Sequence, residues 1–150
     1  MAGSITGVIG RIPTQMGRPQ SVKITLTCTA DVSAHNWPAT VVNTLTNADE
    51  TISIAKFDLR GLKLYSVKMI GGETGPTAGS NLTITDMYGM DLLGGKGVGV
   101  VPTNNGLVWI PTGPSNYAFA ALLQDTMTIN LTGNSVDSAV LTLVLELCGD

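Results

Sequence analysis

Few side chains in this 150-residue sequence are of the types that commonly perform catalysis. His35 is the single histidine and could act as a lone general base, but residues 35–38 mix polar, aromatic and proline residues, which is typical of a loop. Asp86 and Asp91 could form a carboxylate pair of the glycosidase kind. They lie in a glycine-rich segment, however, where aspartate commonly caps its own backbone. We therefore predict that the chain is not an enzyme.

The glycine-rich run at positions 94–99, GGKGVG, invites comparison with a phosphate-binding loop. The spacing does not fit, because Met90 stands where that motif requires its first glycine and Gly97 replaces the Ser or Thr that would hold magnesium. The dinucleotide-binding pattern fails as well, because Val100 occupies the place of its third glycine. We predict that the chain binds no nucleotide and uses no cofactor.

The two cysteines, Cys28 and Cys148, are too few for a disulfide framework or a thiolate metal site. Cys28 continues an apolar alternation that begins at Val22, whereas Cys148 continues a mixed one. We expect two reduced thiols, the first of them in the core, and no metal.

Composition narrows the class of protein further. Apolar residues make up 43% of the chain and charged residues only 13%, and the mean hydropathy is +0.27. A chain of this composition leaves more apolar area on its surface than a lone monomer usually exposes. We therefore expect contacts between subunits. The net charge of −3 offers no electropositive field for nucleic acid. No apolar run reaches a membrane-spanning length, and the start lacks the features of a secretion signal, so we expect synthesis in a cytoplasm and no membrane partner.

Alternation with a period of two residues dominates the chain from position 21 onward, and it predicts β-strands. We expect strands near residues 21–29, 40–45, 52–54, 62–70 and 82–85, with Leu92 and Leu93 filling the core from a turn. Two further runs predict a C-terminal pair of antiparallel strands joined by a turn at 133–135. The stretch 117–124 could form a single helical turn, and the apolar neighbours Val108 and Ile110 favour a place in the core for Trp109.

Together these segments predict an all-β fold, an antiparallel β-sandwich or jelly-roll-like barrel with an extended N-terminal arm. The arm spans residues 1–20, which mix Gly, Pro and Gln with scattered apolar positions, and a frayed terminus is its alternative. Residues 21–150 form a single β domain.

The order of segments over about residues 60–148 resembles a group of small proteins encoded among the structural genes of tailed phages. The resemblance is carried by the strand LKLYSVKMI, the GPTAG loop, the LTITD strand, the DLLGG turn and the final pair of strands. It implies a virion structural component, such as a capsid decoration or cement protein, and it supplies no active-site residue.

We therefore expect a protein that decorates the outer surface of a shell of major capsid protein, as a homo-oligomer with a trimer favoured. Apolar residues of the arm would latch a neighbouring subunit, its arginines would meet carboxylates on the shell, and a tryptophan in a polar loop would join the interface. The expected contact residues are Ile5, Val8, Ile9, Arg11, Ile12, Arg18 and Trp37. The alternatives are another virion part (a head fibre base, a tail or a baseplate protein), a carbohydrate-binding or host-receptor module, and an enzyme.

Overall fold

The computed structural model describes residues 3–12, 21–38, 40–43, 51–53, 62–86, 88–111 and 126–148. Every regular element in these ranges is a β-strand. The strands are β1 (Ser4–Ile12), β2 (Ser21–Thr29), β3 (Thr40–Asn43), β4 (Thr51–Ser53), β5 (Lys63–Gly71), β6 (Asn81–Thr85), β7 (Leu107–Pro111), β8 (Thr126–Thr132) and β9 (Val140–Cys148). The expected all-β fold is confirmed for this part of the chain.

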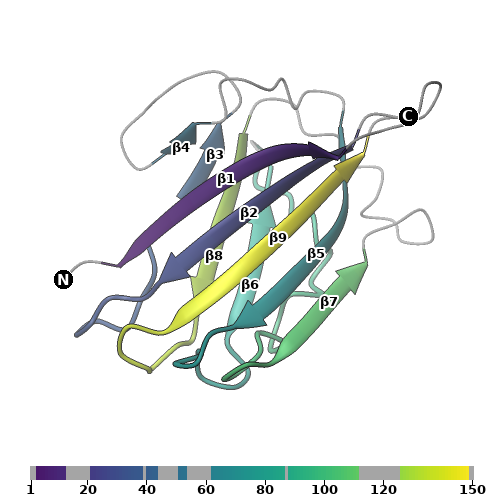
Figure 1. Cartoon of the computed structure of the whole chain (residues 1–150). Coiled ribbons are helices and arrows are strands. Elements are labelled where there is room, and N and C mark those ends of the chain that lie inside the picture. Colours follow the sequence, from purple (N-terminus) through teal and green to yellow (C-terminus); the bar gives the residue numbers. More distant parts are fainter. Residues whose placement is uncertain are drawn as a thin grey trace.

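The strands form two sheets (Figure 1). Sheet A has five strands in the order β1-β2-β9-β5-β7, and all of its neighbours are antiparallel. Sheet B has four strands in the order β4-β3-β8-β6. Its pairs β3–β8 and β6–β8 are antiparallel as expected, and β3 and β4 run parallel at the edge of the sheet.

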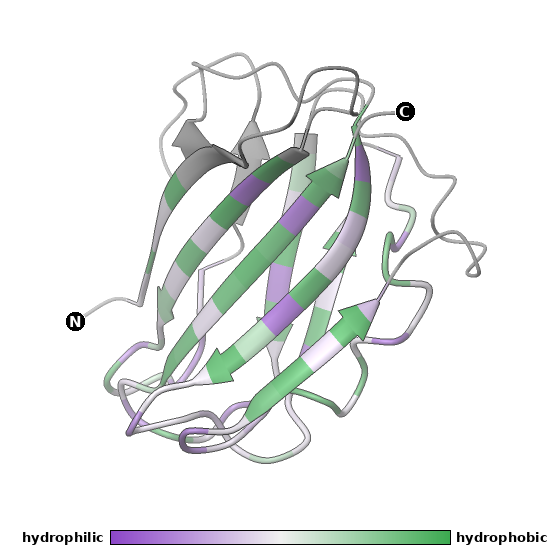
Figure 2. Cartoon of the chain, turned by 45° about the vertical axis from the view of Figure 1, so that its right-hand side comes forward, coloured by the Kyte–Doolittle hydropathy of each residue, from purple (hydrophilic) through white to green (hydrophobic). Residues whose placement is uncertain are grey.

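One hydrophobic core receives side chains from both sheets. On β2 the side chains of Val22, Ile24, Leu26 and Cys28 are fully buried, whereas the threonines and the lysine between them are exposed or half-buried. On β9 the four leucines are buried and Thr142 and Glu146 are half-buried, but Val144 between two of the leucines is also apolar and buried, so the coloured bands of β9 in Figure 2 alternate less regularly. Strand pairing supplies hydrogen-bond partners for the backbone amides and carbonyls. The hydroxyl groups of the outer face interact with water, although this face carries few charges.

Residues 4–12 of the segment expected to be an extended arm form a strand of sheet A. Residues 4–12 pair with β2 along its whole length, from Ser4 opposite Thr29 to Ile12 opposite Ser21. Ile5 is half-buried and packs against the core. These nine residues are therefore an edge strand rather than a free arm, because scattered apolar residues among glycines are enough to build an edge strand once a neighbour supplies the hydrogen bonds.

The C-terminal strands form as expected, but they do not pair with each other. β8 lies in sheet B between β3 and β6, and β9 lies in sheet A between β2 and β5. The segment 133–139 thus carries the chain from one sheet to the other. The predicted pairing is wrong because alternation specifies a strand and its buried face, and it leaves the partner open.

The irregular segment 86–101 covers the outer edge of β6. The amide of Leu82 on β6 donates to the carbonyl of Gly97 at 2.9 Å, and the amide of Leu92 donates to the carbonyl of Ile84 at 2.7 Å. The side chains of Leu92 and Leu93 are 1% and 0% exposed. The prediction that this pair fills the core from a turn is confirmed.

Candidate interaction surface

The two aspartates considered as a catalytic pair serve the backbone of their own loop. One carboxylate oxygen of Asp86 accepts hydrogen bonds from the amides of Tyr88 and Met90, both at 2.9 Å. The carboxylate of Asp91 accepts from the amides of Leu93 at 3.0 Å and Gly95 at 2.7 Å. The interpretation of both as turn-forming residues is confirmed.

His35 is a loop residue held in a tight turn. Its backbone is left-handed, with a φ of 60°, and its carbonyl accepts a hydrogen bond from the side chain of Asn134 at 2.7 Å. Its ring nitrogen Nδ1 lies 2.6 Å from a carboxylate oxygen of Asp137, an ion pair only while the imidazole is protonated. These contacts join the loop after β2 to the connection between β8 and β9.

The glycine-rich run is explained by packing. A side chain at Gly97 would place its Cβ 1.9 Å from the carbonyl oxygen of Leu82, so the loop needs a glycine there to close on β6. Gly94, Gly95 and Gly99 have positive φ values, which glycine adopts without strain.

Both cysteines are free thiols, and Cys28 is buried, as expected. Burial raises the pKa of the Cys28 thiol from 9.0 to about 12. Within the described ranges, no group of three or more His, Cys, Asp or Glu side chains could hold a metal ion.

The outer face of sheet A extends over five strands. The strand registers place Val8, Thr25, Val144, Lys68 and Trp109 in one row across all five strands. Threonines of β2 and β9 occupy much of the rest of this face. The row begins and ends on exposed apolar side chains, because Val8 is 73% and Trp109 is 56% exposed.

A small group of charges lies at one end of this face. Lys68 Nζ is 3.3 Å from Glu146 Oε1, and the hydroxyl of Ser66 donates to Glu146 Oε2 at 3.2 Å. Lys23 stands directly opposite Glu146 on β2. Lysines therefore outnumber the carboxylate in this cluster, on a chain whose net charge is −3.

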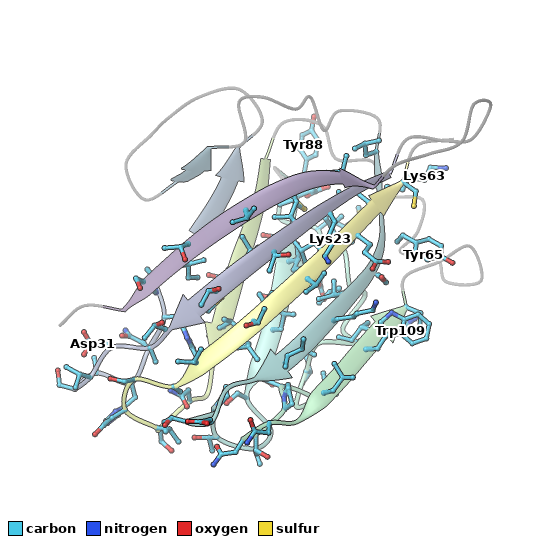
Figure 3. The ribbon with its side chains drawn as sticks, viewed as in Figure 1. Lys23, Asp31, Lys63, Tyr65, Tyr88 and Trp109 are labelled. Carbon is cyan, nitrogen blue, oxygen red and sulfur yellow. The ribbon has the colours of Figure 1, made fainter. Side chains whose placement is uncertain are left out.

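An apolar patch occupies the β5 and β7 edge of the same face. Leu107 is 65% and Ile70 is 41% exposed, and the two residues are directly opposite each other in the strand register. Trp109 lies two residues from Leu107 on the same side of β7. We call these three residues the Trp109 patch. Tyr65, 42% exposed at a bulge of β5, projects from the neighbouring strand on the same side of the molecule (Figure 3).

The two tryptophans occupy the reverse of their expected places. Trp37 is only 5% exposed and belongs to the core, so its surface is not available to a partner in this conformation. The amide of Asp31 donates to the carbonyl of Asn36 at 2.8 Å and closes the loop that carries Trp37. Trp109, expected in the core, is exposed because its neighbours Val108 and Ile110 point inward, and alternation sends the residue between them outward.

The other predicted contact residues lie mostly on β1. Ile5 contacts the core, and Val8 is open to solvent. Ile9, Arg11 and Ile12 are placed by their backbone, opposite residues of β2, while Arg18 falls outside the described residues. The structure therefore places five of the predicted positions on one edge strand, and it places Trp37 in the core against which Ile5 packs.

Comparison with family models, curated proteins and solved structures found no match. Within the described ranges, no helix is long and apolar enough to span a membrane.

Proposed function

We propose that this chain is a capsid decoration protein of a tailed phage, which binds the outer surface of a shell of major capsid protein and stabilises it. The observation that carries the proposal is the Trp109 patch. Exposed aromatic and aliphatic side chains that cluster on one face are typical of protein interfaces, where tryptophan is enriched among the residues that contribute most to binding.

We further propose that the two sheets form a β-sandwich of the jelly-roll type. The strand pairs are nested, since β2 pairs with β9, β3 with β8 and β5 with β7, and β6 lies innermost in the chain. Winding one long antiparallel ribbon produces this order. Segment 86–101, which bonds the outer edge of β6, stands where an eighth strand would pair. Jelly rolls are a common architecture of viral capsid and lectin domains.

The chemistry around the patch suits a proteinaceous shell. Lys68 lies directly opposite Trp109 in the strand register and is 44% exposed, so a carboxylate on the shell could approach it as the apolar side chains are covered. Polar groups at the rim of an apolar contact are the usual arrangement of protein interfaces. Arg11 and Arg18 remain proposed contacts with shell carboxylates.

Occupancy on purified phage particles tests the proposal. Replacing both Leu107 and Trp109 by serine removes two exposed side chains of the patch and leaves the core intact, so we expect affinity for shells to fall roughly tenfold or more, as for truncation of central interface residues. Val98→Ser is the matched control, because Val98 is 62% exposed on the loop 86–101. Unchanged binding by the double variant would refute the role of the patch.

Copy number separates the decoration protein from the alternative virion parts. A protein that covers the shell is present in numbers comparable to those of the major capsid protein, whereas a fibre base, tail or baseplate protein is present in few copies. Quantitative mass spectrometry of purified particles measures this ratio. Few copies per particle would contradict decoration and favour a tail location.

A further inference from the structure

The free edges of the two sheets are protected to different degrees. The outer edge of β6 is covered by segment 86–101, and β4 has three residues. β7 is short and ends at Pro111, a residue that cannot donate to a further strand. β1 has nine residues and, among the described parts of the chain, pairs only with β2. Proteins usually block long edges with charges, prolines or covering segments, yet the one charged residue of β1 is Arg11.

We propose that β1 pairs antiparallel with β1 of a second copy of this chain across a two-fold axis at Val8. Such an axis runs perpendicular to the sheet and places residue 16 − n of one copy opposite residue n of the other. Val8 is the midpoint of Ser4–Ile12, so this register pairs all nine residues. No other two-fold register does so.

The sequence of β1 is compatible with its own copy in this register. Arg11 stands opposite Ile5, and the two copies of Arg11 are offset by six residues, roughly 20 Å along the strands. Like charges are therefore kept apart, and repulsion between directly opposite residues is avoided. Thr6 stands opposite Gly10, which leaves room beside the axis.

Val8 is the residue that gains most from the pairing. Its side chain is 73% exposed on an otherwise hydroxyl-rich face, and at the axis it meets the same side chain of the second copy. The row that runs from Val8 to Trp109 then continues across ten strands. This places one Trp109 patch at each far edge of a joined sheet, so that a dimer carries two patches.

The dimer itself does not depend on the capsid role. The consequence of the dimer for shell binding does rest on the proposed function. A dimer with two Trp109 patches could engage a repeating shell twice, which would raise the avidity. A two-fold dimer also differs from the trimer that the sequence led us to expect, and the mass in solution distinguishes them.

Two measurements test the pairing without a shell. Light scattering of the purified chain is expected to give twice the monomer mass of 15.6 kDa, and a monomer or a trimer would overturn the proposal. In a Cys148→Ser background, Val8→Cys is expected to form a disulfide-linked dimer on mild oxidation. Antiparallel partners have Cα atoms roughly 4.5–5.5 Å apart, which lies within the range that disulfides bridge.

Matched variants control both experiments. Thr6→Cys in the same background stands opposite Gly10 of the second copy and is expected to stay unlinked, so equal crosslinking of the two variants would contradict the register. Val8→Lys places two ammonium groups opposite each other and is expected to give a monomer. Thr27→Lys, an exposed position on β2 away from the edge, is expected to remain a dimer. Failure of the unmodified dimer to bind purified shells would refute the proposed function and leave the pairing of β1 intact.

Discussion

Substituting Gly97 by alanine tests whether the segment 86–101 is held against β6 as described. The new Cβ would lie 1.9 Å from the carbonyl oxygen of Leu82 and 2.9 Å from Cδ1 of Leu93. Non-bonded heavy atoms need roughly 3.5 Å, so the loop and the strand must separate by roughly 1.5 Å. Overpacking of this kind costs about 1–3 kcal/mol, and loss of the 2.9 Å bond from the Leu82 amide to the Gly97 carbonyl adds about 1 kcal/mol.

We therefore expect a loss of about 3 kcal/mol, which lowers the melting temperature of a domain of this size by roughly 6–12 °C. Thermal unfolding followed by circular dichroism measures the shift. The control is Gly95→Ala, where nothing lies within 4 Å and only the φ of +80° opposes a side chain, at a cost of about 1–2 kcal/mol. The close approach of loop and strand is refuted if the melting temperature of Gly97→Ala equals that of the unmodified protein or exceeds that of Gly95→Ala.

Two further predictions concern ionisable groups. The amides of Ala34 and Ser33 and the Ser33 hydroxyl donate to the Asp31 carboxylate and lower its pKa from 3.8 to about 2, so its contribution to stability is present above pH 3.8 and lost as the pH falls through about 2. Asp31→Asn is expected to flatten the acid side of the stability curve, as measured by urea unfolding between these pH values, and an unchanged slope would contradict this. The buried Cys28 thiol, with its pKa raised to about 12, is expected to resist a thiol reagent in the folded Cys148→Ser variant and to react once urea is added. Rapid labelling of the folded chain would show that Cys28 is accessible.

The sequence predicted the parts of the fold that depend on local alternation. β2 is the clearest example, because hydrophobic side chains at Val22, Ile24 and Leu26 alternate with polar ones that stay outside. Leu92 and Leu93 could also be placed in the core, since two adjacent leucines among glycines have no other apolar surroundings to enter. In both cases the apolar residues that are recognisable in the sequence are the same residues that the hydrophobic effect drives into the core.

The parts that could not be predicted depend on partners distant in the chain. β8 and β9 are close in sequence and both alternate, yet each finds its neighbours in a different sheet. The place of Trp37 depends on how a loop closes on itself, which composition does not specify. Trp109 differs from these cases, because the inward neighbours Val108 and Ile110 carried the signal that this side chain points outward.

The two proposed contacts lie on one rigid sheet and are nevertheless separate. β1 and β7 are the opposite edges of sheet A, four inter-strand steps apart, which is roughly 19 Å at the usual strand spacing. Effects of substitutions at this distance normally add, because the sites share no neighbours. Variants at Val8 therefore test the proposed self-association, and variants at Trp109 test the proposed contact with the shell. The strands between the two edges carry exposed or half-buried threonines on their outer face, so this part of the sheet needs no partner to remain in water, and the two proposed contacts can act independently.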